Sequence, residues 1–318
     1  MTWKAYKVVF KLKSPLHIGC GTVGNLQRTR SYVTGKVLWG ALTMRLTRNF
    51  YQQENKPAID SEQYKIFGDK VNKQLAFTYF YPAIEKKEKG TYDIKWPWGN
   101  IKENINENES LFRRRFLSSY ASTALVYPQQ AAEEGLLHEV EFISPRTLDH
   151  GKQVFLVGYV FEKEGCDLKW KCACKRLQIG GERGYGWGDL QYVPDPTKTE
   201  SNKLFNICDW KSEESNKLFD IYDWKSENGS ILIQTLENSH LLAHTETTDT
   251  ENLSIQGEIE PLVGREWRSH ESKNPYAGQH IEKFCDPCWI PGSQLGQSSA
   301  FIIKEFGIWK SKTYNEKA

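Results

Sequence analysis

Several features that mark membrane or secreted proteins are missing from this sequence. Its 318 residues contain no run that approaches the roughly 18 consecutive apolar residues of a membrane-spanning helix. The first residues have no apolar core followed by small residues, as a secretory signal would have. The seven cysteines are odd in number and are not densely spaced, which argues against a disulfide framework. We therefore expect a cytoplasmic protein with reduced thiols and no membrane partner.

Acidic residues are missing from the first 50 positions. This segment holds nine Lys or Arg and no Asp or Glu, whereas residues 195–260 carry fourteen acids and five Lys. The net charge of +2 for the whole chain hides this asymmetry. A strongly basic segment of this kind is typical of a surface that binds a polyanion.

The N-terminal segment predicts a strand, a loop and a helix. Apolar residues alternate with lysines over Lys4–Lys13, which predicts a strand with one buried face and one exposed basic face. Residues 14–36 contain several glycines and predict a loop. The helix that follows is predicted by apolar side chains at four-residue spacing, namely Leu38, Leu42, Leu46 and Phe50.

The middle of the chain predicts further strands and one more helix. Strands are expected at Leu75–Ala83 and Gln153–Glu162, with a polar loop at Glu85–Asn108 and a hairpin at residues 122–145. A short helix at Asp167–Leu177 precedes a Gly-rich loop and a last strand. This order predicts an α+β fold of the ferredoxin-like (RNA-recognition-motif-like) class, with helices on one face of an antiparallel sheet.

A duplicated segment divides the chain. Residues 200–213 and 214–227 differ at two positions only, and fourteen residues repeated twice are too few for a solenoid. We expect a domain at 1–195, an acidic surface connector at 196–228 and a smaller β-rich C-terminal region at 229–318. The seven acids of the two copies, against four Lys, would repel phosphate.

The Gly-rich loop places five glycines in nine positions, from Gly180 to Gly188. Glycine lets backbone N–H groups approach a phosphate, Arg183 adds positive charge, and Tyr185 or Trp187 offers a stacking face for an unpaired base. A simple turn between two elements is the alternative. A dinucleotide site is disfavoured, because that fingerprint follows a strand and opens a helix.

Four segments, in order, resemble motifs of the RAMP (repeat-associated mysterious protein) superfamily. They are SPLHIGCG at 14–21, TGKVLWGALTMRL at 34–46, YKIFGD at 64–69 and IGGERGYGWGDL at 179–190. The chain departs from the family pattern before the first helix, where Pro-Gly-Ser is usual and residues 32–36 are YVTGK. An IPGS at 290–293 leaves open whether the C-terminal region is a degenerate second RAMP-like unit.

The resemblance implies a non-catalytic subunit of a type III CRISPR antiviral effector complex that binds guide RNA (crRNA). The Gly-rich loop is most similar to that of the type III-D subunit that caps the 5′ handle of the guide. Guide RNA and other type III effector subunits are the expected partners, and no cofactor or metal is expected. The residues expected to contact RNA are His17, Gly19, Gly21, Arg28, Arg30, Lys36, Arg45, Arg113, Arg114, Arg115, Gly180, Gly181, Arg183, Gly184, Tyr185, Gly186 and Trp187.

Two enzyme functions remain as alternatives. His17 could act as a general base in metal-free processing of the guide, and a loop aspartate such as Asp69 or Asp149 could cut target RNA in a backbone subunit. No partner acid or base for His17 is identifiable in the sequence. A zinc site is a further alternative, but its four thiolates would combine one CxxC pair with one CxC pair, namely Cys285, Cys288, Cys172 and Cys174.

Overall fold

The computed structural model describes residues 2–99, 109–128, 130–194, 216–251, 253–268 and 276–312. Within them the chain is α+β, as predicted, with many strands and few helices. The helices are α1 (Gly35–Gln53), α2 (Ser61–Gln74), α3 (Glu109–Phe116) and α4 (Trp170–Ala173), with 3-10 turns η1 (Arg183–Tyr185) and η2 (Glu305–Gly307). No helix in these ranges is long and apolar enough to cross a membrane.

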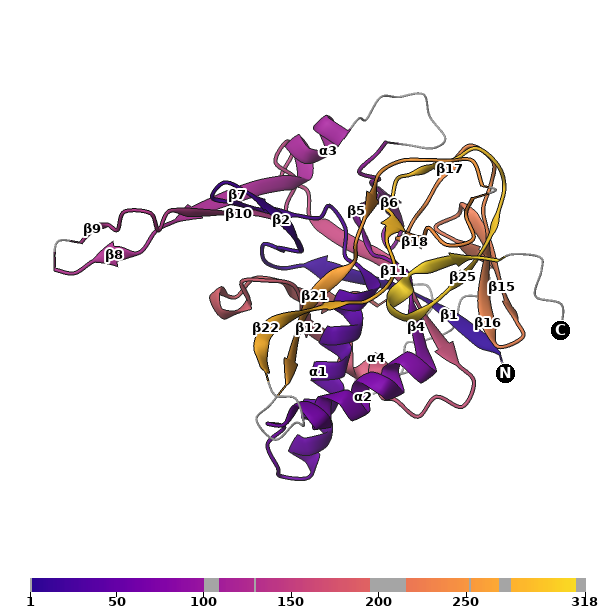
Figure 1. The fold of residues 1–318 in the computed structure, drawn as a ribbon, viewed down its shortest axis with the longest axis horizontal. Helices are drawn as coiled ribbons and strands as arrows, with labels where there is room; N and C mark the ends of the chain where they lie inside the picture. Colours follow the sequence, from indigo (N-terminus) through magenta and orange to yellow (C-terminus); the bar gives the residue numbers. More distant parts are fainter. Residues whose placement is uncertain are drawn as a thin grey trace.

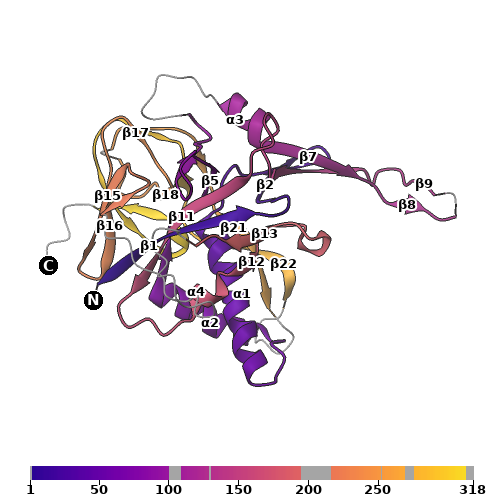
Figure 2. The same cartoon turned by 180° about the vertical axis from the view of Figure 1, so that it is seen from behind.

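An antiparallel sheet forms the centre of the N-terminal half. Its strands are β1 (Trp3–Leu12), β4 (Leu75–Phe77), β5 (Tyr81–Glu85), β6 (Tyr92–Ile94), β11 (Val154–Lys163), β12 (Arg176–Gln178) and β13 (Asp189–Tyr192). Their order is β12-β13-β1-β11-β5-β6, and β4 also pairs with β11. Helices α1 and α2 cover one face of this sheet, and the C-terminal strands lie against the other (Figures 1 and 2).

Strand β1 confirms the predicted strand but not its exposed basic face. Tyr6, Val8 and Phe10 point into the core beneath the helices, as the alternation predicts. On the opposite face Val9 is buried in a small cluster with strand β11, and Lys7 and Lys11 are only half-exposed. Because β1 lies between β13 and β11, side chains of the neighbouring strands cover part of the face on which the sequence predicted exposed lysines.

The predicted helices and the predicted polar loop are partly corrected. In α1 the apolar stripe ends one turn early, because Phe50 is 45% exposed. The helix expected at Asp167–Leu177 is limited to α4, because Leu177 belongs to β12 and pairs with Leu190 at the edge of the sheet. The polar loop expected at Glu85–Asn108 contains β6, and its residues 100–108 lie outside the described ranges.

A second sheet carries a long projecting hairpin. It contains β2 (Gly19–Val23), β3 (Leu26–Thr29), β7 (Leu117–Ser122) and β10 (His138–Ile143), and β8 (Leu125–Val126) pairs with β9 (Ala131–Ala132) near the tip. The hairpin extends far from the body of the molecule (Figure 1). Strands β2 and β3 occupy a segment for which the sequence predicted a loop.

The C-terminal half is β-rich and packs against the central sheet. One sheet has the order β14-β15-β16-β25-β26-β18-β23-β20, β19 and β17 flank β24, and β21 pairs with β22. The bounds are β14 (Lys217–Leu218), β15 (Tyr222–Glu227), β16 (Ser230–Gln234), β17 (Ser239–His240), β18 (Thr245–Glu246), β19 (Ile255–Gln256), β20 (Ile259–Glu260), β21 (Val263–Arg268), β22 (Tyr276–Lys283), β23 (Cys288–Trp289), β24 (Gln294–Leu295), β25 (Ala300–Ile303) and β26 (Trp309–Ser311).

The second copy of the duplicated segment is not a surface connector, contrary to the expectation. Its residues form β14 and β15, and Leu218, Tyr222 and Trp224 are buried in a core shared with Tyr159 and Phe161 of the central sheet. Its exposed charges alternate with these buried side chains, so acidic composition hid a half-buried strand. The first copy lies outside the described residues.

Candidate nucleic-acid interface

A cavity of about 670 Å³ lies where four segments meet, one of which contributes Ala58 and Tyr64 from the α1–α2 connection and α2. His17 and Gly19 come from the segment after β1, Lys36 and Arg48 from α1, and Arg183 from the Gly-rich loop between β12 and β13. His17, Lys36, Arg48 and Arg183 make the lining basic, and none of the described residues that line it is Asp or Glu. The cavity is therefore an electropositive pocket suited to a phosphate-rich ligand.

The Gly-rich loop is held in place by the backbone of residues 15–17. The N–H of Gly181 donates to the His17 carbonyl at 2.8 Å, and the N–H of Gly188 donates to the Pro15 carbonyl at 2.7 Å. A Cβ at Gly180 would lie 2.3 Å from the His17 carbonyl oxygen. Glycine is thus required at Gly180 and Gly188 by the packing of protein on protein, and the N–H groups of Gly181 and Gly188 already donate within the chain.

The tip of the loop is exposed and differs from its base. Gly184 has open space around it, and Tyr185 is 84% exposed. Trp187 instead lies half-buried with its ring edge-on to Phe142, at a centroid distance of 5.0 Å. Of the two predicted stacking residues, Tyr185 is the one whose ring is open to solvent.

His17 has a defined tautomer. Its Nδ1 lies 2.7 Å from the Glu141 carbonyl oxygen, and because a carbonyl can only accept, Nδ1 carries the proton. The side chain is buried, and Nε2 lies beside Gly19 in the wall of the cavity. Nε2 can accept a hydrogen bond when the ring is neutral and donate one when it is charged.

Arg30 was expected to contact RNA, but the structure uses it to join the two halves of the chain. Its guanidinium donates to Glu260 of β20 at 2.6 Å, and the two side chains are 15% and 28% exposed. Burial alone would raise the pKa of Glu260, but hydrogen bonds from His244 and Arg30 outweigh it and lower the pKa to about 2. A phosphate would have to compete with this partly buried carboxylate for Arg30.

We expect Arg30→Ala to lower the free energy of unfolding by about 2–3 kcal/mol, because the partly buried Glu260 carboxylate loses its cationic partner and keeps only the hydrogen bond from His244. The folded pKa of Glu260 is below its unfolded value, so the pair stabilises the fold above about pH 4.3 and loses this effect as the pH falls toward 2. Denaturant unfolding at pH 7 and pH 3 measures both the loss of stability and its dependence on pH. Arg28→Ala, on an exposed neighbour, is the control and should change nothing; equal stability of the Arg30 and Arg28 variants would contradict the assignment.

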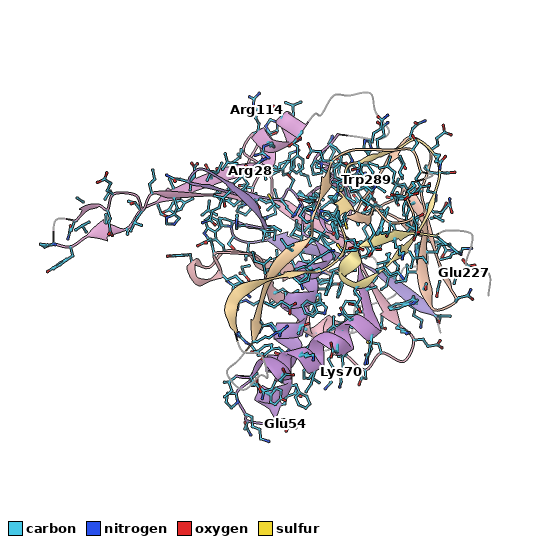
Figure 3. All side chains as sticks on the ribbon, viewed as in Figure 1. Arg28, Glu54, Lys70, Arg114, Glu227 and Trp289 are labelled. Atoms are coloured by element: carbon cyan, nitrogen blue, oxygen red, sulfur yellow. The ribbon has the colours of Figure 1, made fainter. Side chains whose placement is uncertain are left out.

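The other basic candidates lie outside the cavity. Arg113 pairs with Glu141, and Arg115 pairs with Asp149 at 2.9 Å, so both meet a carboxylate of the same chain. Arg28 on β3 and Arg114 on α3 are exposed near the base of the long hairpin (Figure 3). The remaining candidates, Gly21, Arg45 and Gly186, do not line the cavity either.

The loop aspartates of one enzyme alternative lie outside the cavity, and the cysteines of the zinc alternative do not form a metal site among the described residues. Neither Asp69 nor Asp149 lines the cavity with His17. The sulfurs of Cys285 and Cys288 lie 3.1 Å apart, but Cys174 is buried in the core between the helices and the central sheet. Among the described residues, no group of three or more His, Cys, Asp or Glu could hold a metal ion.

The sequence analysis missed Arg48, the hydrogen bond that holds Arg48, and the hydrogen bonds from Gln178 that hold the Gly-rich loop. Arg48 Nε donates to the Tyr64 hydroxyl at 3.3 Å, and Gln178 donates to the Arg183 and Trp187 carbonyls at 2.9 and 3.1 Å. Helical spacing could have found Arg48, because residues four apart share a face. Counting from Lys36 gives positions 40, 44 and 48, all of which line the cavity, whereas Arg45 is one residue off this row.

Solved structures of low sequence identity and one family profile are similar to this chain. A chain of the type III-B Cmr-beta complex bound to cognate target RNA and AMPPnP is 11% identical, with a TM-score of 0.48 over 91% of this chain and 85% of that one. Cmr6 from Pyrococcus furiosus is 13% identical, with a TM-score of 0.29 over 60% and 98%. No curated protein matches. A family profile described as RAMPs, RAMP superfamily, matches residues 9–191, which is more than half of the chain. The protein therefore belongs to the RAMP superfamily.

Proposed function

We propose that this chain is a non-catalytic subunit of a type III CRISPR effector complex and that it holds the 5′ handle of the guide RNA. The observation that carries the proposal is the cavity of about 670 Å³, with four basic side chains and no acid among its described lining residues. Tyr185, two residues after the lining residue Arg183, exposes its ring to solvent, so an unpaired base could stack on it. A basic cavity for phosphate and an exposed aromatic ring for an unpaired base together suit single-stranded RNA.

The topology of the central sheet supports the ferredoxin-like fold that the sequence predicted. Taken in chain order, β1, α1, β5, β11, α4 and β13 make a βαββαβ sequence, and the strands lie in the order β13-β1-β11-β5. This is the split βαβ arrangement that many RNA-binding domains share. The helices cover one face, and the cavity opens where α1 meets the loop before β13.

Binding of single-stranded RNA as a function of salt tests the proposal. Each phosphate that the cavity neutralises releases condensed counterions, so log Kd should rise with log salt by about 0.7 per contact. Fluorescence anisotropy with labelled RNA between low and physiological salt measures the slope. A slope near zero would remove the electrostatic basis of the proposal.

The long hairpin is proposed to contact a neighbouring subunit and not RNA. Its tip exposes apolar side chains, and residues 123–137 include Glu133 and Glu134 but no Lys or Arg. An apolar and acidic surface suits a protein groove better than a phosphate backbone. The exposed side chains are Leu125, Val126, Tyr127, Leu136 and Leu137.

We expect the double substitution of Leu125 and Leu137 by serine to leave RNA affinity unchanged and to weaken assembly with the other subunits at least tenfold, because both side chains are more than half exposed. Size-exclusion chromatography of co-expressed subunits, next to RNA titration of the isolated chain, separates the two effects. Lost RNA affinity with normal assembly would reverse the assignment of the hairpin.

We expect His17→Ala to leave the cleavage products of guide precursor and target RNA unchanged, because its Nδ1 is committed to the Glu141 carbonyl and no carboxylate orients it among the described residues. The measurement is a denaturing gel of both substrates after incubation with the assembled complex. If guide maturation stopped while RNA binding persisted, a processing endoribonuclease would be the correct function.

A further inference from the structure

A smaller cavity of about 200 Å³ adjoins the basic one. The two share Ile18, Gly19, Lys36 and Val37, so they are continuous at the start of α1. The outer wall of the smaller cavity comes from the C-terminal half, through β21 and Phe284, which follows β22. Figure 1 shows the β21–β22 hairpin lying beside α1.

The lining of the smaller cavity is mainly apolar and aromatic, unlike that of its neighbour. Val263, Phe284, Phe306 and Ile308 contribute apolar surface, and none of the described lining residues is Asp or Glu. An apolar cavity of about 150 Å³ is large enough for benzene, so this one has room for one flat ring system. It is too small for a second nucleotide in addition.

Lys36 marks the junction between the two cavities. Its ammonium lies 3.2 Å from the centroid of the Phe284 ring and 4.3 Å from that of Phe306. It also lies 3.3 Å from a carboxylate oxygen of Glu266. The ammonium therefore covers one face of the Phe284 ring, and a base that stacks on this face has to displace Lys36 from the ring and from Glu266.

Hydroxyl groups supply hydrogen-bonding capacity at the inner wall. His244 Nε2 lies 2.6 Å from the Glu260 carboxylate and donates to it, so Nδ1 accepts from the Tyr79 hydroxyl at 2.7 Å. The Tyr79 oxygen keeps its acceptor capacity. Thr34, the residue before α1, makes no side-chain cap hydrogen bond, and its hydroxyl can donate or accept.

We propose that the smaller cavity takes one splayed nucleobase of the RNA strand whose phosphates occupy the basic cavity. The inference rests on the proposed function. The base stacks on Phe284, its edge meets the hydroxyls of Tyr79 and Thr34, and Lys36 turns toward the adjoining phosphate. Phosphate and base are thus read by the two halves of the chain, with Lys36 between them.

The experiment compares two ligands, a uridine oligonucleotide of about twelve residues and a ribose-phosphate oligomer of the same length without bases. Val263→Trp fills the mouth of the smaller cavity, and Phe284→Ala removes the stacking ring. Ile281→Trp is the matched control, because Ile281 is on the same hairpin, is 63% exposed and does not line the cavity. Affinities are measured by anisotropy at one salt concentration.

Val263→Trp and Phe284→Ala should each weaken uridine binding roughly tenfold and leave the base-free oligomer unaffected, as loss of one stacked base predicts. Ile281→Trp should change neither. The inference is overturned if both variants keep the parent's ratio of affinities for the two ligands. Arg48→Ala, in the basic cavity, should weaken both ligands equally. If the parent bound neither ligand, the proposed function itself would fail. If the parent bound both ligands equally well, the proposed function would stand, and only the inference about the base would be overturned.

Discussion

Replacing Trp224 by alanine is expected to lower the free energy of unfolding by about 3–5 kcal/mol, the range for truncating a buried aromatic side chain. Trp224 is 8% exposed, lies on β15 opposite Ile233, and packs edge-on to Phe161 at a centroid distance of 5.0 Å. It therefore joins the C-terminal core to the central sheet. Urea unfolding followed by tryptophan fluorescence and circular dichroism measures the loss.

The control for Trp224 lies on the same strand. Asp223 and Lys225 flank it, point to solvent and make ion pairs of the exposed kind, which contribute about 0–1 kcal/mol. Alanine at either position should change the midpoint little. Deletion of residues 216–227 should prevent the C-terminal core from forming, and a deleted chain with parental stability would show that the repeat is a connector after all.

Local patterns predicted elements well where one face of the element is buried. Alternation identified β1, and four-residue spacing identified α1 up to Leu46. The same reasoning missed β15, because its polar face is so acidic that the composition suggested a solvated connector. Burial of the apolar face depends on Phe161 and other partners far away in sequence, which a local pattern does not contain.

The sequence named several residues of the candidate site, but it did not predict why the Gly-rich loop needs its glycines. His17, Lys36 and Arg183, which the sequence analysis expected to contact RNA, line one cavity. The glycines were expected to approach phosphate, but Gly180 and Gly188 are required by contacts with protein carbonyls. A glycine pattern indicates close approach without saying which group approaches, and only the packing of distant segments decides that.

Counting charge along the chain overestimated the charge available to RNA. Arg30 and Glu260 are 230 positions apart, and their pairing is invisible to any local count. Arg113 and Arg115 likewise meet Glu141 and Asp149 from other segments. Lys36 in the cavity also lies 3.3 Å from Glu266, so among the described residues the cations of the cavity lining that stand outside an ion pair are Arg48 and Arg183.

We expect the double variant Arg48→Ala/Arg183→Ala to bind single-stranded RNA roughly a hundredfold more weakly at low salt, since each charge-assisted hydrogen bond contributes about 1.5–3 kcal/mol before screening. Both side chains are exposed, line the basic cavity and come from different segments. The slope of log Kd against log salt should fall by about 1.4, that is 0.7 for each phosphate contact removed. Anisotropy titrations over a range of salt give both quantities.

The control removes equal charge from another surface. Lys70 and Lys73 are exposed on α2 and do not line the cavity, and Lys70 lies on the helix away from the long hairpin (Figure 3). Lys70→Ala/Lys73→Ala lowers the net charge by the same two units, so it measures the general field of the protein. If both double variants lost the same affinity and the same salt slope, RNA would be held by net charge and not by the cavity. A larger loss for the Arg48/Arg183 variant, with unchanged thermal stability, localises the phosphates between α1 and the Gly-rich loop.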